Sequence, residues 1–180
     1  TLRRVVPEGA VTPRASESTH RALTVSVVGL WHLGCVTAAC LAAAGHDVVA
    51  WDDDPEVVAD LRAARLPIVE PGLEDLIRRE SNSGRLRFED DGTLIGATDV
   101  TWITWDTPID DNDKADVDGV LGRIERLFPY LRHYTIVIVS SQLPVGSIAD
   151  IERRFSAARP GCSVSFACIP ENLRVGKALD

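Results

Sequence analysis

The sequence of 180 residues contains no methionine and is poor in aromatic residues, which make up 6% of it. Positive charge is scarce too, because 19 Lys and Arg stand against 27 Asp and Glu, for a formal net charge of −8 at pH 7. Proteins that bind nucleic acids diffusely, or that attach to anionic membranes, need a basic surface. The charge balance therefore argues against both kinds of partner. Since an intact gene product normally begins with Met, we expect this chain to be a fragment or an excised domain.

The four cysteines show no metal-binding arrangement. Cys35, Cys40, Cys162 and Cys168 form no C-x-x-C pair, and the histidines lie far apart in the sequence. The Asp-rich stretch 106–118 lacks the Gly and the Glu of an EF-hand calcium loop. The sequence thus predicts no metal site and four reduced thiols, which is typical of a cytoplasmic protein.

A long uncharged stretch raises the possibility of a membrane segment. No Asp, Glu, Lys or Arg occurs between Arg21 and Asp47, which is long enough for a membrane helix or a signal sequence. The stretch changes character halfway, because 24–29 is rich in β-branched residues and 35–44 is rich in alanine. Two glycines and His32 separate these parts. This pattern is typical of a strand, a turn and a helix, so we expect no membrane segment.

The rest of the chain alternates between apolar runs and amphipathic segments. Residues 1–23 show little periodicity and are predicted to form a mobile arm or linker, with one domain over 24–180. Strands are predicted at 24–29, 47–52, 86–88, 99–105, 135–140 and 163–168, and helices at 34–44, 55–64, shortly after 71–72, at 116–131 and from about 146. Such alternation predicts a doubly wound α/β domain with a parallel sheet of about six strands, in the order 3-2-1-4-5-6. Ligands of such sheets bind at the carboxyl ends of the strands.

A glycine-rich turn follows the first predicted strand. Gly29 and Gly34 match the first and third glycines of the dinucleotide fingerprint G-x-G-x-x-G, and Trp31 stands in place of the second. Backbone N–H groups at the start of the next helix would face a pyrophosphate, helped by the helix dipole. The alternative is an ordinary tight turn between a strand and a helix.

Asp52 ends the second predicted strand, 23 residues after Gly29. A carboxylate there accepts hydrogen bonds from an adenosine ribose and repels a 2′-phosphate, which favours NAD over NADP. The alternative is that Asp52, Asp53 and Asp54 form a capping run before Pro55. Together with the glycine turn, Asp52 predicts a Rossmann-like dinucleotide-binding domain over 24–180.

The chain resembles the N-terminal, NAD-binding part of the UDP-glucose/GDP-mannose dehydrogenases from about Leu23 to Asp180. Six motifs in order carry this resemblance: the glycine turn at 29–34, Gly45-His46-x-Val48 with Asp52-x-Asp54, the stretch 67–73 (PIVEPGL), Thr107-Pro108, the stretch 141–146 (SQLPVG) and the stretch 170–176 (PENLRVG). The family oxidises the C6 alcohol of a nucleotide sugar to a carboxylate with two NAD. The resemblance implies an NAD-dependent oxidoreductase whose substrate is a nucleotide sugar, with UDP-glucose as the first expectation.

The resemblance also assigns roles to residues. The turn, formed by Gly29, Trp31, His32, Leu33 and Gly34, is expected to hold the pyrophosphate, with the N–H groups of His32 and Leu33 as donors. Asp52 is expected to hold the adenosine ribose, and Thr107, Ser141 and Gln142 to line the path to the nicotinamide. Glu171 matches a carboxylate that activates water. Glu171 and Gln142 form the predicted catalytic pair, and Gln142 replaces a Thr that relays a proton in the family. Glu171, Asn172, Leu173 and Arg174 match the segment that contacts the sugar nucleotide.

Several positions depart from the family. Trp31 replaces a glycine, Val57 replaces a frequent Lys or Arg, Ile169 replaces an Asn, and Val175 replaces a Glu. The family's nucleophilic Cys and catalytic Lys belong to central and C-terminal parts that have no counterpart here. We therefore expect this fragment to bind NAD without catalysing the reaction alone, and to form a homodimer only with those parts. Two alternatives stay open: part of another NAD-dependent hydroxyacid dehydrogenase, or a non-catalytic binding module with a degenerate glycine turn.

Overall fold

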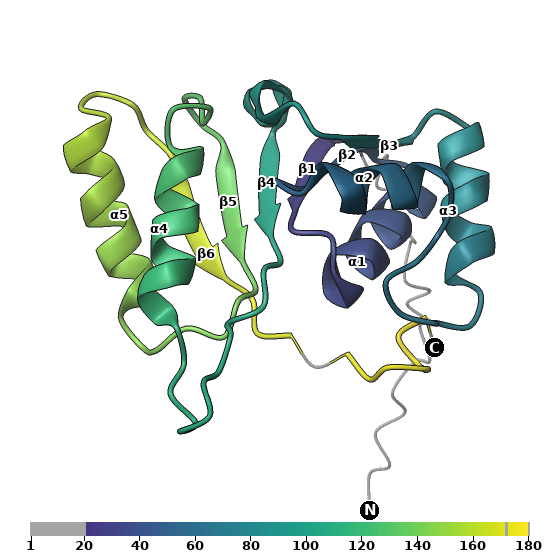
Figure 1. Ribbon diagram of the computed structural model, residues 1–180. Helices are drawn as coiled ribbons and strands as arrows, with labels where there is room; N and C mark the ends of the chain where they lie inside the picture. The colour runs from purple at the N-terminus through teal and green to yellow at the C-terminus, as the bar shows by residue number, and fades with distance from the viewer. Residues whose placement is uncertain (1–20, 172, 180) are drawn as a thin grey trace, which may run out of the picture.

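A single parallel sheet organises the chain (Figure 1). The computed structural model describes residues 21–171 and 173–179. Its six strands lie in the order β3-β2-β1-β4-β5-β6, and every neighbouring pair is parallel. The strands are β1 (Thr24–Val28), β2 (Asp47–Trp51), β3 (Leu86–Glu89), β4 (Val100–Ile103), β5 (Ile136–Val139) and β6 (Ser165–Cys168). The predicted doubly wound fold and strand order are confirmed.

Helices connect the strands and cover the sheet. They are α1 (His32–Ala43), α2 (Pro55–Arg62), α3 (Leu73–Asn82), α4 (Val117–Leu127) and α5 (Ser147–Ala158), with a 3-10 helix, η1, over Gly92–Ala97. Figure 1 shows α4 and α5 beside the half of the sheet formed by β4–β6, and α1, α2 and α3 around the half formed by β1–β3. The described part of the chain thus forms the two halves typical of a doubly wound domain.

Some predicted boundaries were wrong. Helix α1 begins at His32 rather than at 34, because Trp31 already accepts the first helical bond, from the N–H of Cys35. Helix α4 ends at Leu127 rather than at 131, because Pro129 has no N–H to continue it. Strand β4 is shorter than 99–105, β6 begins at Ser165 rather than at 163, and η1 was not predicted.

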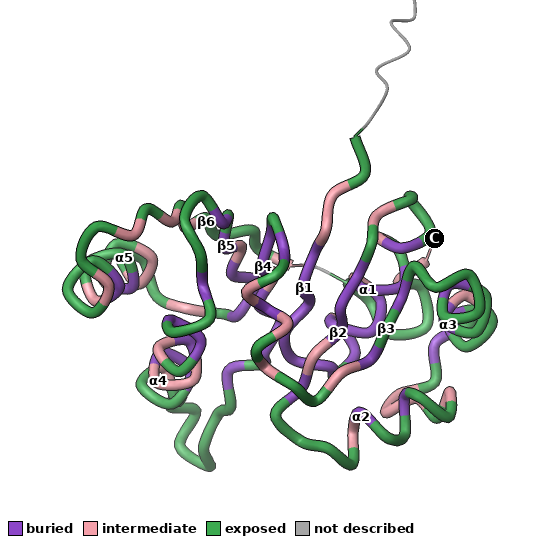
Figure 2. Tube along the Cα trace, turned by 90° about the horizontal axis from the view of Figure 1, so that it is seen from above, coloured by how far each residue is buried: buried purple, intermediate pink, exposed green. Residues whose placement is uncertain are grey.

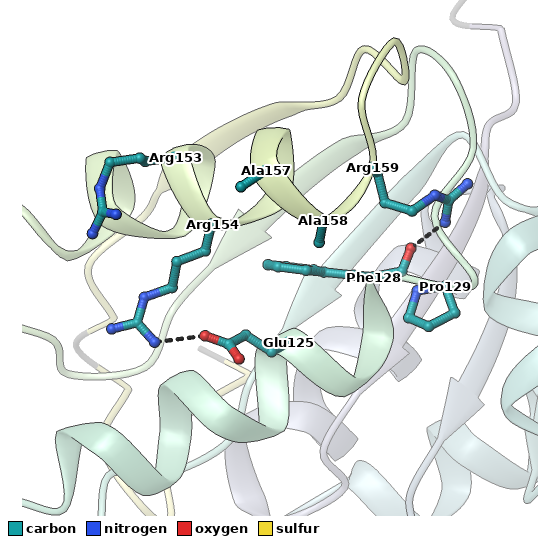
Figure 3. A pocket seen from close by; sticks show the side chains of 8 residues that line it. All are labelled: Glu125, Phe128, Pro129, Arg153, Arg154, Ala157, Ala158 and Arg159. Atoms are coloured by element: carbon teal, nitrogen blue, oxygen red, sulfur yellow. Dashed lines mark hydrogen bonds and ion pairs between the residues drawn. The ribbon is translucent and has the colours of Figure 1, made fainter.

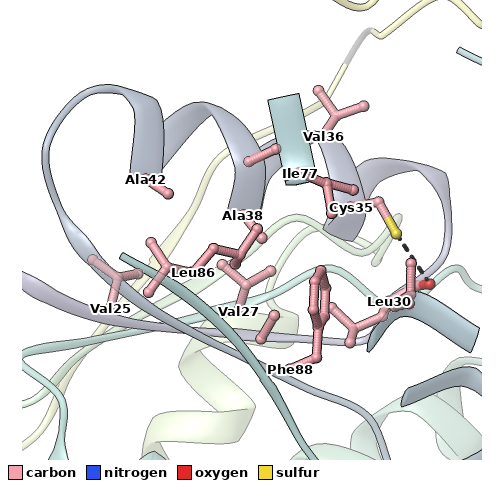
Figure 4. Packing of buried hydrophobic residues seen from close by; sticks show 14 of the residues in the cluster. Val25, Val27, Leu30, Cys35, Val36, Ala38, Ala42, Ile77, Leu86 and Phe88 are labelled. Carbon is pink, nitrogen blue, oxygen red and sulfur yellow. Dashed lines mark hydrogen bonds between the residues drawn. The ribbon is translucent and has the colours of Figure 1, made fainter. Parts of the chain in front are cut away.

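Two apolar clusters hold the layers together. One packs the inner side of α1 and α3 on β1–β3 and includes Val27, Leu30 and Phe88 (Figure 4). The other packs α4 and α5 on β4 and β5 and includes Ile103, Phe128 and Phe155. Figure 2 shows the central strands buried and the outer sides of the helices exposed. Burial on both faces explains why every residue from Val25 to Val28 of β1 is buried, with the hydroxyl of Ser26 donating to the carbonyl oxygen of Val100.

The uncharged stretch between Arg21 and Asp47 is divided between β1, the glycine turn and α1, as its change of character predicts. Within 21–171 and 173–179, no helix is both long and apolar enough to cross a bilayer. The predicted mobile arm over 1–23 falls almost wholly on residues 1–20, which lie outside the described residues, as does Asn172.

Candidate functional site

The predicted site residues gather at one edge of the sheet, where the strands end. In Figure 1 the arrowheads of β4, β5 and β6 point to this edge, and the segment that follows β6 runs along it toward α1 and α3. The glycine turn follows β1, Asp52 follows β2, and Thr107, Ser141 and Glu171 follow β4, β5 and β6. The topology thus brings together residues up to 142 positions apart in the sequence, from 29 to 171.

The glycine turn needs both of its glycines. Gly29 has a φ of +98°, a conformation that L side chains rarely adopt, and a Cβ there would lie 2.5 Å from Cδ1 of Trp105. A Cβ on Gly34 would lie 1.8 Å from the carbonyl oxygen of Gly29. The turn is therefore packed directly beneath α1, which brings the start of the helix close to the end of β1.

The start of α1 is open to an anion. Its N-cap, Trp31, is in an extended conformation and supplies no side-chain hydrogen bond, and the first turn carries no acidic residue. The N–H groups of His32 and Leu33 lie in this first turn, where helices leave N–H groups without a helical partner. The Trp31 side chain is 49% exposed. These features fit the pyrophosphate of a dinucleotide, although the backbone at Trp31 carries a Cβ that a glycine would lack.

Asp52 joins the end of β2 to the glycine turn. Its Oδ2 accepts a hydrogen bond of 2.7 Å from the N–H of Leu30, and its Oδ1 accepts one of 3.0 Å from Asp54. The cap of α2 is Asp54, which accepts from the N–H of Glu56, so capping falls to Asp54 and leaves Asp52 for the turn. Burial raises the pKa of Asp52, and the two backbone N–H groups oppose that rise. The carboxylate lies at the position expected for a ribose acceptor.

The loops after β4 and β5 are tied to each other. The Thr107 hydroxyl donates to the carbonyl oxygen of Gln142 at 2.9 Å, and the Ser141 hydroxyl donates to that of Trp105 at 2.6 Å. Thr107 and Ser141 are buried, while the side chain of Gln142 is exposed. The two hydroxyls thus fix the relative position of the loops that form one wall of the site.

Glu70 is a site residue that sequence reasoning missed. Its carboxylate Oε2 lies 2.9 Å from Nε2 of His32, and both side chains are buried. The same carboxylate accepts hydrogen bonds from the N–H groups of Gly176 and Ala178, at 2.8 and 2.9 Å. Glu70 therefore links the glycine turn to the segment after β6. Glu70 belongs to the motif at 67–73, but no local pattern in the sequence predicts its contacts with residues 38 positions earlier and 106 positions later.

Carboxylates also meet at the other end of this segment. Desolvation and the nearby carboxylate of Glu171 raise the pKa of Asp106, while His32 lowers it. Glu171 accepts a hydrogen bond from the N–H of Leu173, and the side chains of Leu173 and Arg174 are exposed. The charges of Glu171 and His32 are thus both close enough to affect the ionisation of Asp106. In the described part of the chain, no group of three metal-ligating side chains comes together.

A broad cavity at the other end of α4 has a different character (Figure 3). Arg153, Arg154 and Arg159 line it, but each guanidinium already has a partner. Arg153 pairs with Asp150, Arg154 with Glu125, and Arg159 donates to the carbonyl oxygen of Phe128. The geometry offers no predicted site residue there, so the carboxyl edge of the sheet remains the candidate site.

Comparison with known proteins agrees with the family resemblance that the sequence motifs indicate. Residues 23–180 match the model of the UDP-glucose/GDP-mannose dehydrogenase family, NAD binding domain. The chain is 34% identical over 160 residues to UDP-glucose 6-dehydrogenase of Rhizobium meliloti, which covers 88% of this chain and 37% of the relative. It is 36% identical over 163 residues to UDP-glucose 6-dehydrogenase of Pseudomonas aeruginosa, with coverages of 88% and 36%.

Among solved structures, a UDP-glucose dehydrogenase from Pyrobaculum islandicum superposes with a TM-score of 0.80 at 35% identity, over 94% of this chain and 39% of that one. The chain thus spans little more than a third of the length of the relatives it matches.

Proposed function

This chain belongs to the UDP-glucose/GDP-mannose dehydrogenase family as an NAD-binding domain, and from that premise we propose that it provides the cofactor site of a nucleotide-sugar 6-dehydrogenase. The proposed reaction oxidises the C6 alcohol of the sugar to a carboxylate in two steps, and bound NAD accepts a hydride in each. The proposed substrate is UDP-glucose. The domain, over 24–180, would bind cofactor without completing this reaction alone.

The observation that carries the proposal is the hydrogen bond from the N–H of Leu30 to Asp52. It fixes the expected ribose acceptor against the turn expected to hold the pyrophosphate. The N–H groups of His32 and Leu33 would bind the phosphates, and Thr107, Ser141 and Gln142 would lie along the path to the nicotinamide.

The substrate side of the proposal rests on the segment after β6. Glu171, Asn172, Leu173 and Arg174 would contact the nucleotide sugar, and Glu171 would act as the base that activates water. The position of Glu171 after β6, at the same edge of the sheet as the glycine turn and the loops after β4 and β5, supports this role. Gln142, from the loop after β5, is proposed to orient the reacting groups beside Glu171.

The proposed location of the protein is the cytoplasm. All four cysteines are free thiols, which fits the reducing cytoplasm. A homodimer would form through the parts of the family that this chain does not span. The net charge of −8 argues against binding to nucleic acids or to anionic membranes.

Calorimetric titration of the chain with NAD and with NADP tests the cofactor site. We expect saturable binding of NAD, weaker binding of NADP, and about a tenfold or greater loss of NAD affinity in Asp52→Asn, because a bond to a charged acceptor is lost. Asp54→Asn is the matched control, since Asn also caps helices and should leave the affinity unchanged.

Absence of NAD binding in the wild type would favour the alternative of a binding module with a degenerate turn. NAD binding without any response to UDP-glucose, when the domain is tested within the longer enzyme, would favour another hydroxyacid dehydrogenase.

A further inference from the structure

An ion pair spans the crevice between the two halves of the sheet, next to Asp52. Arg123, on α4, places Nη2 2.6 Å from Oδ1 of Asp53, which lies 70 residues earlier in the loop after β2. Arg126 adds a longer contact to Asp53 at 3.7 Å. The strand order reverses between β1 and β4, and ligands of doubly wound sheets bind in the crevice at that point. Asp53, in the loop after β2, and Arg123, on α4, thus link the two halves of the sheet at this point.

The guanidinium of Arg123 packs on the aromatic ring of Trp105. The Arg123 guanidinium lies 4.2 Å from the centroid of the Trp105 ring, and Trp105 in turn lies against Gly29 of the glycine turn. Trp105 is 5% exposed, whereas about a third of the Arg123 side chain is exposed. Gly29, the indole and the guanidinium therefore form a stack that ends in a planar cation open to the crevice.

Two further features lie beside this stack. Within the described residues, the buried indole N–H groups of Trp105 and Trp51 have no hydrogen-bond partner, and their rings meet edge to face at 6.5 Å. Helix α2 also offers no cation at its start, because position 57 is a half-buried Val packed on the core. A ligand whose ribose binds Asp52 would extend toward Arg123, the cation that faces this part of the crevice.

We propose that Arg123, stacked on Trp105 and oriented by Asp53, binds the adenine ring of the dinucleotide on its exposed guanidinium face. Guanidinium groups are planar and weakly hydrated, so they stack well on flat aromatic rings. The inference rests on the proposed function, because it requires a dinucleotide in this crevice. It assigns to α4 the contact with the adenosine end that α2 does not provide.

The test uses ADP-ribose, which is NAD without its nicotinamide, titrated against the whole chain. Arg123→Ala should weaken ADP-ribose binding about tenfold, and Arg123→Lys nearly as much, because lysine keeps the charge but not the planar stack. Arg126→Ala is the matched control and should change the affinity less than about twofold, because its contact to Asp53 is longer and more exposed. Thermal unfolding of each variant checks that the fold is retained.

The outcomes separate this inference from the proposed function. Wild-type binding of NAD and ADP-ribose with unchanged or tighter binding by Arg123→Ala would overturn the inference alone, since Arg123 would then only cover the crevice. Full affinity in Arg123→Lys would overturn the stacking. Tighter binding of 2′-phospho-ADP-ribose than of ADP-ribose would also overturn it, because Arg123 would then serve a phosphate. A wild type that binds neither NAD nor ADP-ribose would overturn the proposed function together with the inference.

Discussion

Nε2 of His32 lies 2.9 Å from Oε2 of Glu70, and this buried contact joins the expected cofactor turn to the expected substrate segment. His32 stands at the start of α1, while Glu70 also accepts the N–H groups of Gly176 and Ala178. One carboxylate therefore fixes both the start of the helix and the chain that follows β6. The two parts of the site that are expected to bind ligands are therefore held by the same side chain.

The Glu70 contact predicts a specific pH dependence of stability. Burial opposes its ionisation, but the hydrogen bonds from His32, Ala178 and Gly176 outweigh burial and hold the pKa of Glu70 below its usual value of 4.5. A lowered pKa in the folded state stabilises the fold above pH 4.5, and this contribution is lost as the pH falls through the lower value. Glu70→Gln should destabilise the chain near neutral pH, and its difference from the wild type should shrink as the pH falls below 4.5.

Urea unfolding at several pH values measures this difference. The exposed Glu152→Gln is the control, since it should leave the urea midpoint almost unchanged at each pH. A Glu70→Gln midpoint equal to that of the wild type near pH 7 would show that the carboxylate does not support the site.

Alanine substitutions at two different glycines should change the free energy of unfolding in opposite directions. Gly34→Ala places a Cβ against the Gly29 carbonyl oxygen and the Thr104 hydroxyl, so we expect a loss of about 3 kcal/mol in the free energy of unfolding. Gly122→Ala lies inside α4 with open space around the new Cβ, so it should stabilise by about 0.5–1 kcal/mol. Chemical denaturation measures both. Equal effects of the two substitutions would contradict the close packing of the turn beneath α1.

Substitution of Trp31 should change the affinity for NAD without changing the fold. Its side chain is 49% exposed, so Trp31→Gly should leave the unfolding midpoint within a few degrees of the wild type. Removing the Cβ lets the backbone approach the pyrophosphate more closely, so the variant should bind NAD more tightly. A calorimetric titration of both proteins gives the two dissociation constants. Weaker binding by Trp31→Gly would mean that the indole itself contacts the cofactor.

The thiols of Cys35, Cys40 and Cys168 should differ in reactivity. Burial, aided by the negative charge of Asp52, raises the pKa of Cys35 to about 12. Partial burial also raises the pKa of Cys40, but Cys40 and Cys168 are both exposed. Because the thiolate is the reactive form, iodoacetamide should label Cys40 and Cys168 in the folded chain and Cys35 only after unfolding. Mass spectrometry of peptides locates the label. Rapid labelling of Cys35 in the folded chain would show that the core beneath the glycine turn opens easily.

The strand order and the family could be predicted because their signals are local. Apolar runs, the glycines of the turn and Asp52 lie within short stretches of sequence, and the match over 23–180 confirms the resemblance drawn from six motifs. The predicted roles of Thr107, Ser141, Gln142 and Glu171 remain predictions.

The long-range contacts could not be predicted. His32 reaches Glu70 across 38 residues, and Asp53 reaches Arg123 across 70, and each pair forms only when the folded sheet brings distant loops together. Nothing periodic marks such residues in the sequence. By contrast, η1 had a local signal that was overlooked, because Asp91 accepts from the N–H of Thr93 two residues later, as capping residues do.

Amide-resolved NMR during an NAD titration shows whether NAD binds across the glycine turn and Asp52. We expect the largest shifts at the amides of Leu30, His32, Leu33 and Gly34 and at Asp54, whose N–H is bonded to Asp52. Saturable shifts at these residues, in the loops after β4 and β5 and at Arg123 would support the site. Unmoved amides in the turn at millimolar NAD, or shifts centred on the cavity between α4 and α5, would contradict it.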